Sequence, residues 1–303
     1  MDGRITNLEQ IASVRRYTIT DGKGAGLRVI DCDNGTIRFL LNESKALDMM
    51  QLYYKGQNVS FVSKNAFTAR EVDFLSRFEG GMIYTCGLDS VGGREGHELH
   101  GNLHNTPAEV FRAECSEKGI VIEARVRVSQ LFGENLVLCR KVSAAVGADT
   151  VTVEDTLTNE GHKDASYALL YHINVGYPML DEGAVLRGDI QNAEARNDWA
   201  QKNIATYREM SLPTPDGEET CYYLTLGTPS VTLENPKLGR SFTVAYSGDV
   251  LTHFLEWKSM VSGDYALGLE PTTTRLDDGF ATKTLGAGES TSFCVSLSVR
   301  DIK

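Results

Sequence analysis

Three of the six histidines in this chain of 303 residues lie within a stretch of eight residues, between glycine-rich turns and a proline. They are His97, His100 and His104, in the segment Phe78–Ala108, which reads FEGGMIYTCGLDSVGGREGHELHGNLHNTPA. Imidazoles exchange protons near neutral pH, and glycines let a backbone approach a ligand closely. The segment is therefore predicted to form the floor of an active site, with a solvated loop carrying incidental histidines as an equally weighted alternative.

The spacing within this cluster favours hydrogen bonding over metal binding. On a strand, His100, Asn102 and His104 would share one face, because strand side chains alternate with period two. A metal site is the weaker alternative, since His97, Glu98 and His100 lack a helical His-x-x-x-His frame. No cysteine or further carboxylate stands at a familiar ligand spacing. We therefore predict no metal site.

A fourth histidine, His172, follows an apolar strand in the segment LLYHINVGYPMLDEG. A histidine in that place is expected to be at least partly buried. The usual structural explanation is a core histidine whose ring nitrogens are satisfied by backbone groups. Asn174 lies two residues further on, and hence on the same face of the strand, which shifts the balance toward a functional site.

The segment YALGLEPTTT places Glu270 at the end of an apolar strand, directly before Pro271. Burial raises the pKa of a carboxyl group, and nearby donors or cations lower it, so a partly dry position can provide a general base. The alternative is an exposed glutamate at a strand end, which is the commoner fate of this residue type. Upstream, Trp257 and Lys258 add an aromatic face and a cation.

The elements that must position these side chains are short strands, separated by Gly, Asn and Asp turns. GLRVIDCDNGTIRFLLN, from Gly26, predicts a hairpin around Asp33-Asn34-Gly35. Further strands are predicted at 119–130, 136–144, 150–159, 165–174, 222–228, 230–234, 242–247, 251–257, 265–270 and 292–299. Helices are predicted only within 7–17 and 192–202. The pattern favours an all-β sandwich or barrel, with 1–303 as one domain on which 1–26 packs as an N-terminal extension.

Composition narrows the partners and the compartment. The formal net charge of -11 argues against nucleic acid or an anionic membrane as partner. No apolar run has the character of a signal peptide or a membrane span, and we expect a cytoplasmic protein. The cysteines form no Cys-x-x-Cys pair and are expected to be reduced thiols in the core. They are Cys32, Cys86, Cys115, Cys139, Cys221 and Cys294.

Taken in order, these motifs resemble those of the galactose mutarotase-like superfamily, in particular a branch of aldose 1-epimerase-like proteins. The resemblance covers most of the chain from about Leu27. MIYTCGLDSVG followed by HGNLHNTPA is similar to the branch's GG-LLTTCGLDNVG and HGR-x-x-NTPA. VEDTLTNEG is similar to its D-x-x-TN strand, and LLYHINVGYPMLDEG matches its pattern almost in full. LGLEP corresponds to the Leu-Glu-Pro strand end that carries the family's glutamate.

The resemblance implies a large antiparallel β-sandwich, the galactose mutarotase-like supersandwich, with a few short helices and a concave face that holds a monosaccharide. It implies an isomerase that works without a cofactor and interconverts the α and β anomers of a sugar. Carried over by motif, Glu270 is the base that takes the proton of the anomeric hydroxyl, and His172 is the acid that protonates the ring oxygen. His100 then lies beside the ring oxygen or the anomeric hydroxyl.

Two departures from the family pattern concern substrate recognition. Asn102 stands where the branch has Arg after His-Gly, and Lys45 in NESKALD replaces the Arg of LPDRG-x-D. Each change removes a planar, bidentate donor, which leaves open the hydroxyl pattern and any anionic substituent of the sugar. The substrate-binding candidates are Lys45, Asp48, Asp89, Arg94, Asn102, Asn174 and Lys258.

Two other functions stay open at this point. One is a non-catalytic carbohydrate-binding or sensing protein, although a pure binder has no need for an acid and a base. The other is a lyase or hydrolase on the same fold. A hydrolase requires a second carboxyl at a suitable distance from Glu270, for which Asp89 is a candidate. A homodimer formed through exposed edge strands is compatible with the sequence.

Overall fold

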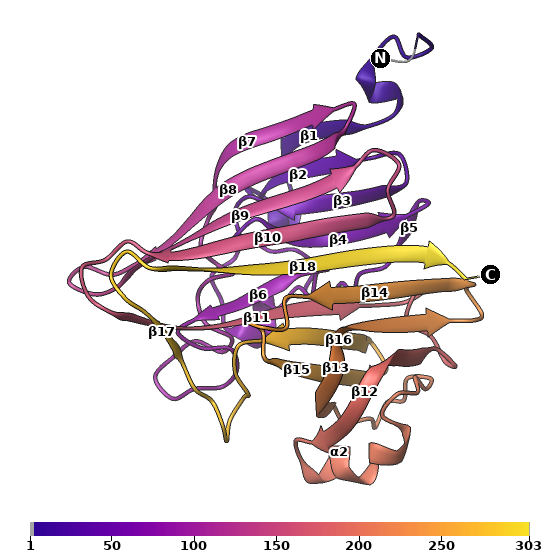
Figure 1. Ribbon diagram of the computed structural model, residues 1–303. Helices are drawn as coiled ribbons and strands as arrows, with labels where there is room; N and C mark the ends of the chain where they lie inside the picture. Colours follow the sequence, from indigo (N-terminus) through magenta and orange to yellow (C-terminus); the bar gives the residue numbers. More distant parts are fainter. Residues whose placement is uncertain (1–2, 303) are drawn as a thin grey trace.

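Alternation of apolar and polar residues produces strands that bury one face. In β8 (Gly119–Ser129), the side chains of Ile120, Ile122, Ala124 and Val126 are buried, and the residues between them are partly exposed. The computed structural model, which describes residues 3–302, arranges such strands in two stacked antiparallel sheets (Figure 1). The predicted all-β sandwich is confirmed.

The smaller sheet contains β1 (Ser13–Thr18), β2 (Arg28–Asp33), β3 (Ile37–Asn42), β4 (Asp48–Tyr54) and β5 (Gln57–Asn58), in that order. The larger sheet runs β17 (Lys283–Leu285), β11 (Ala165–Val175), β16 (Asp264–Thr272), β15 (His253–Val261), β13 (Thr220–Asn235), β14 (Arg240–Tyr246), β18 (Ser290–Asp301), β10 (Thr150–Asn159), β9 (Asn135–Ala145), β8 and β7 (Glu109–Ser116). Two more strands join it from the side: β12 (Val185–Ala195) pairs with β13, and β6 (Tyr84–Leu88) pairs with β11.

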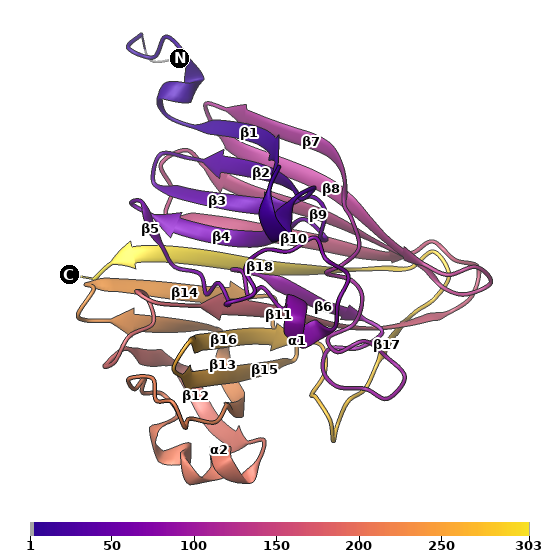
Figure 2. The same ribbon diagram turned by 180° about the vertical axis from the view of Figure 1, so that it is seen from behind.

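The smaller sheet covers only one part of the larger sheet. Seen from behind, β1–β4 lie over β7–β10, whereas β11, β13, β15 and β16 extend beyond them (Figure 2). Between residues 3 and 302, helical structure is limited to short pieces. These are η1 (Leu8–Gln10), η2 (Gly22–Gly24), α1 (Phe74–Arg77), α2 (Asp198–Lys202) and η3 (Ile204–Thr206).

The predicted hairpin is confirmed, with Asp33, Asn34 and Gly35 at the junction of β2 and β3. Gly35 has a φ of 88°, and a Cβ there would lie 2.8 Å from the carbonyl oxygen of Ile11. Both the conformation and the close approach require glycine at this turn.

The two predicted helices are largely wrong. Residues 7–17 form one 3-10 turn followed by β1, because Ser13–Thr18 pair with β2 along their whole length. Residues 192–195 continue β12, and only Asp198–Lys202 are helical. In both places pairing with a neighbouring strand overrides a weak local helical pattern.

The strands predicted at 222–228 and 230–234 are one continuous strand, β13. Pro229, which separates the two predicted strands, lies in a stretch that makes no pair with β12, where the register shifts between Gly188 and Ile190. A proline costs a strand little where its missing N–H has no partner to bond.

All six cysteines are free thiols, as predicted, but only part of them lie in the core. Cys32, Cys86 and Cys221 are buried, whereas Cys139 is exposed, contrary to the expectation. Within residues 3–302, no helix is long and apolar enough to cross a membrane.

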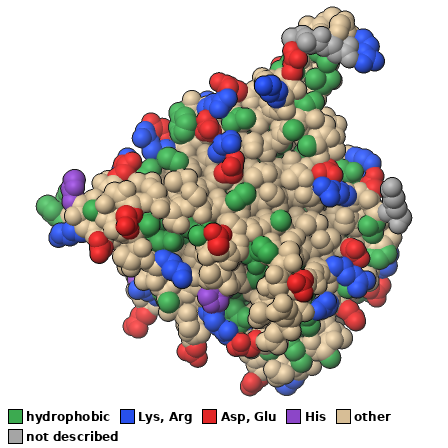
Figure 3. All heavy atoms as spheres, in the orientation of Figure 1, with side chains coloured by type: hydrophobic (Ala, Val, Ile, Leu, Met, Phe, Trp, Pro, Cys, Tyr) green, Lys and Arg blue, Asp and Glu red, His purple; other side chains and the backbone are tan. Residues whose placement is uncertain are grey.

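Acidic and basic side chains are interspersed over the face shown in Figure 3. Many form exposed pairs, such as Lys141 with Glu154 and Arg112 with Glu123. Exposed ion pairs of this kind contribute little to stability. The charges that matter for the fold are therefore the buried ones.

A buried arginine joins the two sheets. Arg140 on β9, only 2% exposed, donates to both Asp155 on β10 and Asp48 on β4 of the smaller sheet. It also donates to the hydroxyl of Thr85, and Tyr171 on β11 donates to Asp155 over 2.6 Å. Burial alone would raise the pKa of Asp48, but Arg140 holds it below its usual range. Asp48 is thus ionised, and the guanidinium of Arg140 donates from all three of its nitrogens.

Replacing Arg140 with alanine is expected to lower the free energy of unfolding by about 3–5 kcal/mol, because Asp48 and Asp155 would stay buried without their counter-charge. Urea denaturation of the variant and the wild type measures this loss. Arg300→Ala is the matched control, since Arg300 pairs with Asp149 at the surface and should change stability little. Equal losses in the two variants would show that the buried network is not a main source of stability.

Candidate active site

The strand register places a row of side chains across five neighbouring strands. On β6 and β11, Tyr84 lies opposite His172. On β11 and β16, Leu170 pairs with Thr272 and Ile173 with Leu269, and this register brings His172 next to Glu270. Glu270 in turn lies opposite Leu255 on β15, which faces Tyr223 on β13. Residues that lie opposite one another in antiparallel strands share a face, so the histidine and the glutamate that were predicted from separate motifs are direct neighbours.

A cavity of about 680 Å³ opens over this row. The polar and aromatic residues of its wall include His100, His172, Glu270, Trp257, Arg196 and Glu219. The volume lies within the range of small-molecule sites. The three predicted catalytic residues therefore meet in one cavity, although they come from three separate stretches of the chain.

His172 and Glu270 lie close together in a nearly dry setting. His172 Nε2 is 3.2 Å from Glu270 Oε1, and the two side chains are 6% and 3% exposed. His172 Nδ1 and Glu270 Oε1 have no hydrogen-bond partner among the described residues. Buried polar atoms without partners are rare, and here both belong to groups on the cavity wall. They are free to bond to hydroxyl groups of a ligand.

Aromatic rings surround His172. Its ring centroid lies 5.6 Å from those of Phe78 and His100, and 5.4 Å from that of Trp257. Burial among these rings, together with the nearby His100, lowers the pKa of His172 to about 3. The imidazole is therefore uncharged at neutral pH.

His100 is held in one tautomer by the loop that carries it. Its Nδ1 lies 2.9 Å from the carbonyl oxygen of Val91, which can only accept, so Nδ1 carries the hydrogen and Nε2 keeps its lone pair. The residue has a φ of 66°, a conformation that few non-glycine residues adopt. Burial lowers the pKa of His100 to about 4. A strained backbone here positions a neutral hydrogen-bond acceptor.

Glu270 has the opposite shift. Burial raises its pKa to about 8, opposed by Arg196 and reinforced by Glu219. Space for the carboxyl comes from Gly268 on the same face of β16, where a Cβ would lie 2.3 Å from Glu270 Oε1. At neutral pH the pair of His172 and Glu270 consequently holds one proton, which rests on the carboxyl.

A neutral histidine beside a protonated carboxyl group can take a proton from one ligand oxygen and give one to another. The total number of protons on the pair is the same before and after such a transfer. This is the requirement for a reaction that moves a hydrogen between two oxygens of one molecule. The arrangement therefore suits an isomerisation without net proton uptake.

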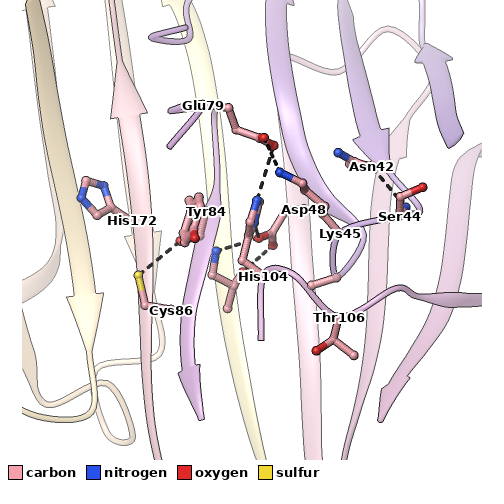
Figure 4. Close-up of polar contacts among 12 residues, drawn as sticks. Asn42, Ser44, Lys45, Asp48, Glu79, Tyr84, Cys86, His104, Thr106 and His172 are labelled. Atoms are coloured by element: carbon pink, nitrogen blue, oxygen red, sulfur yellow. Dashed lines mark hydrogen bonds and ion pairs between the residues drawn. The ribbon is translucent and has the colours of Figure 1, made fainter. Parts of the chain in front are cut away.

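Two of the predicted binding residues lie outside the cavity wall, in a buried charge network. Asp48 accepts from His104 Nδ1 over 2.6 Å, and Lys45 donates to Glu79 (Figure 4). His104 lies between these two carboxylates, with its Nε2 3.4 Å from Glu79 Oε1. Its ring stacks on Tyr84 with a centroid distance of 3.7 Å. This network supports the cavity floor through Tyr84 and does not line the cavity.

Three further binding candidates lie in the loop after β6. Asp89 lies 3.1 Å from the Nδ1 of His97, and Arg94 donates to the carbonyl of Asp89. Asn102 is exposed, and its carbonyl oxygen accepts from Thr106. The wall of the cavity includes none of these three candidates.

The last two candidates belong to strands of the site but do not line the cavity. Asn174 is buried and donates to the carbonyl of His172. Lys258 is buried on the face of β15 opposite to Trp257, where its ammonium donates to three backbone carbonyls, those of residues 206, 207 and 209. Since strand neighbours point to opposite faces, Trp257 and Lys258 could not both serve one site.

Sequence reasoning missed several residues of the cavity. Arg196 and Glu219 come from turns near strand ends, and no motif marks either one. Phe74 at the start of α1 and Phe78 directly after it cover the histidines, with Phe74 5.0 Å from the ring of His100. In the sequence, the only indication that these two residues share one face is their spacing of four residues. Within residues 3–302, no group of three or more His, Cys, Asp or Glu side chains is arranged to hold a metal ion.

The chain is similar to one protein family and to several solved structures. Residues 24–299 match the family described as "Domain of unknown function (DUF4432)". No curated protein has a significantly similar sequence.

The structural relatives share the fold at low identity. A "putative aldose 1-epimerase" from Klebsiella pneumoniae superposes with a TM-score of 0.83 at 20% identity, covering 95% of this chain and 83% of that one. A galactose mutarotase-like protein from Clostridium acetobutylicum gives 0.69 at 14% identity, covering 97% and 100%. A "putative mutarotase" from Salmonella typhimurium gives 0.69 at 13%, covering 98% and 96%. The predicted mutarotase-like sandwich is thereby confirmed as the fold.

Ring resonances of the two cavity histidines are expected to stay those of neutral imidazole down to about pH 4 for His100 and about pH 3 for His172. Because unfolded histidine takes up its proton near pH 6.5, the unfolded chain binds more protons at these two positions below that pH, and their contribution to stability should fall as the pH falls from 6.5 toward 4. Nitrogen-15 NMR across this range measures both pKa values and the tautomers. The variants His100→Gln and His172→Gln assign the signals. A midpoint near 6.5 for either ring would show that the cavity is wetter than described.

Proposed function

This chain belongs to the DUF4432 family of domains of unknown function, and we propose that it acts as an aldose 1-epimerase. The proposed reaction interconverts the α and β anomers of a free aldose bound in the cavity over β11 and β16. The observation that carries the proposal is the His172–Glu270 pair, whose Nε2 and Oε1 atoms lie 3.2 Å apart in a nearly dry cavity. The names of the structural relatives point to the same class of reaction.

Mutarotation needs one proton removed and one supplied. A base takes the proton of the anomeric hydroxyl, the bond between the anomeric carbon and the ring oxygen breaks, and an acid protonates that oxygen. The products are an aldehyde and a new hydroxyl group. Rotation about the bond next to the aldehyde carbon, followed by the reverse transfer, closes the ring with the other configuration.

The family resemblance assigns the base to Glu270 and the acid to His172. That assignment needs an ionised carboxyl and a protonated imidazole, which hold the same single proton as the resting pair. Transfer of the proton from Glu270 to His172 reaches that state without exchange with solvent, although it runs against the order of their pKa values, about 8 and about 3. His100, with its Nε2 lone pair free, accepts a hydrogen bond from a sugar hydroxyl and fixes the ring beside the pair.

The surroundings of the pair support a sugar as the ligand. Trp257 presents a ring at the cavity wall, and Glu219 accepts its indole N–H over 2.8 Å, which fixes the ring orientation. Aromatic rings offer an apolar surface to the C–H groups of a sugar ring. Asp89, the candidate for the second carboxyl of a hydrolase, is bonded to His97 away from this wall.

Wild-type protein is expected to accelerate anomer exchange of at least one free aldose, and Glu270→Gln and His172→Asn should each lower the catalysed rate by about 10²-fold or more. Exchange spectroscopy by NMR, over a panel that includes D-glucose and D-galactose, measures the rate above the uncatalysed background. Lys258→Met is the control, because Lys258 lies on the other face of β15. Detectable sugar binding without acceleration would instead favour a sensing protein.

The catalysed rate is also expected to fall as the pH rises through about 8, because the pair then loses its only proton. Rates measured between pH 5 and pH 10, corrected for hydroxide catalysis, test this.

Gly268→Ala is expected to leave the fold intact and to reduce the rate strongly, because the new methyl group would displace the Glu270 carboxyl, the movable partner in the clash. Gly93→Ala is the matched control in the same cavity, where a Cβ would meet only Leu99 at 3.9 Å. Thermal melting of both variants shows that the fold is retained, and anomer exchange gives the rates. Similar activities for the two variants would contradict the described position of the carboxyl.

A further inference from the structure

We propose that Arg196 is the residue that binds and orients the sugar in this cavity, by donating from its terminal amino groups to oxygen atoms of the ring substituents. The inference rests on the proposed function, because it concerns the same site. It assigns a role to a residue that lies outside every motif of the family resemblance.

The backbone anchors Arg196 at the cavity wall. The residue follows β12 directly, and its N–H donates to the carbonyl of Cys221 over 2.9 Å. Cys221 lies opposite Trp257 in the pairing of β13 with β15, and all three residues line the cavity. The guanidinium therefore starts from a fixed point beside the aromatic ring proposed to carry the sugar.

The side chain is held at one end only. Its Nε donates to Asp277, and the side chain is 29% exposed. Neither terminal amino group has a hydrogen-bond partner within residues 3–302. A guanidinium held through Nε presents its remaining donors in a fixed fork, and such a fork matches two neighbouring oxygen atoms. The ion pair with Asp277 thus fixes the orientation of the two free terminal amino groups.

Among the residues that the structure describes, Arg196 is the only arginine that lines the cavity. The one lysine of that wall, Lys64, pairs with Asp264 at the exposed rim. Arg77 pairs with Glu98, and Arg94 lies over the ring of Phe280. The other nearby cations are therefore already engaged in contacts of their own.

The charge of Arg196 reaches both catalytic groups. It lowers the pKa of Glu270, which burial raises more strongly. It also lowers the pKa of His100, in the same direction as the larger effect of burial. Arg196 lines the same cavity as both groups, so its guanidinium can contact a sugar bound between them. It also provides a planar hydrogen-bond donor, which Asn102, in its exposed position, does not provide.

The chain contains a matched control for Arg196. Two ion pairs connect the end of β12 to the loop after β16, with opposite polarity: Arg196 with Asp277, and Glu194 with Arg275. Arg275 stacks on Tyr223 at 3.8 Å and lies outside the cavity wall. The two arginines therefore make the same structural connection, but only Arg196 adjoins the proposed sugar.

The experiment compares Arg196→Gln, Arg196→Lys and Arg275→Gln with the wild type, using the aldose that the wild type converts fastest. Arg196→Gln is expected to raise KM about 10- to 100-fold, the usual effect of losing hydrogen bonds to a charged group. Arg196→Lys should recover part of the affinity, and Arg275→Gln should leave KM within about 2-fold. The alkaline limb of the pH profile should move upward in Arg196→Gln alone, since the carboxyl loses the cation that favours its ionised form.

A purely structural role for Arg196 would change thermal stability to a similar degree in both glutamine variants and leave KM and the pH limb unmoved, which would overturn the proposal. Calorimetric titration with D-galactose and D-glucose separates this inference from the proposed function. A wild type that binds sugar without turnover, with binding weakened in Arg196→Gln, would reject the epimerase and retain the role of Arg196. Turnover by the wild type, with unchanged affinity in Arg196→Gln, would retain the epimerase and reject the role of Arg196.

Discussion

Arg140 and two aspartates form a buried ionic contact between the two sheets. The guanidinium of Arg140, carried by the larger sheet, reaches Asp48 in the smaller one and Asp155 on the neighbouring strand. Ions buried at this depth need nearly ideal geometry to be tolerated, so the network sets how the two sheets are placed against each other. Thr85 and Tyr171, which belong to the same network, lie on the two strands that also carry Tyr84 and His172.

Strand alternation connects this network to the cavity. Tyr171 points toward the interior between the sheets, and its neighbour His172 points to the other side of β11, into the cavity. The same holds on β16, where Leu269 belongs to the core and Glu270 to the cavity wall. A movement of one strand relative to its neighbour would therefore disturb the ionic network and the catalytic pair together. The position of the pair is determined by the packing of the core behind it.

Much of the fold could be predicted from the sequence, and less of the site. The alternation of apolar and polar residues identified most strands, because a strand that buries one face requires an apolar residue at every second position. His172 and Glu270 could be found because each stands in a motif at a strand. Arg196 could not, since its place depends on where β12 ends, and that segment was predicted to be helical. Lys258 shows the converse limit: a cation next to Trp257 in sequence lies on the other face, bonded to carbonyls.

The strands that carry the catalytic pair are buried on both faces: nearly every residue of β11 and of the second half of β16 is inaccessible to solvent. Such positions have little mutational tolerance, because each side chain contacts either the core or the cavity. Variation in substrate preference, in evolution or in the laboratory, must therefore come from the surrounding segments: α1, the turn after β12 and the loop after β16. A combinatorial library restricted to these three segments would diversify the cavity wall and keep its chemistry constant.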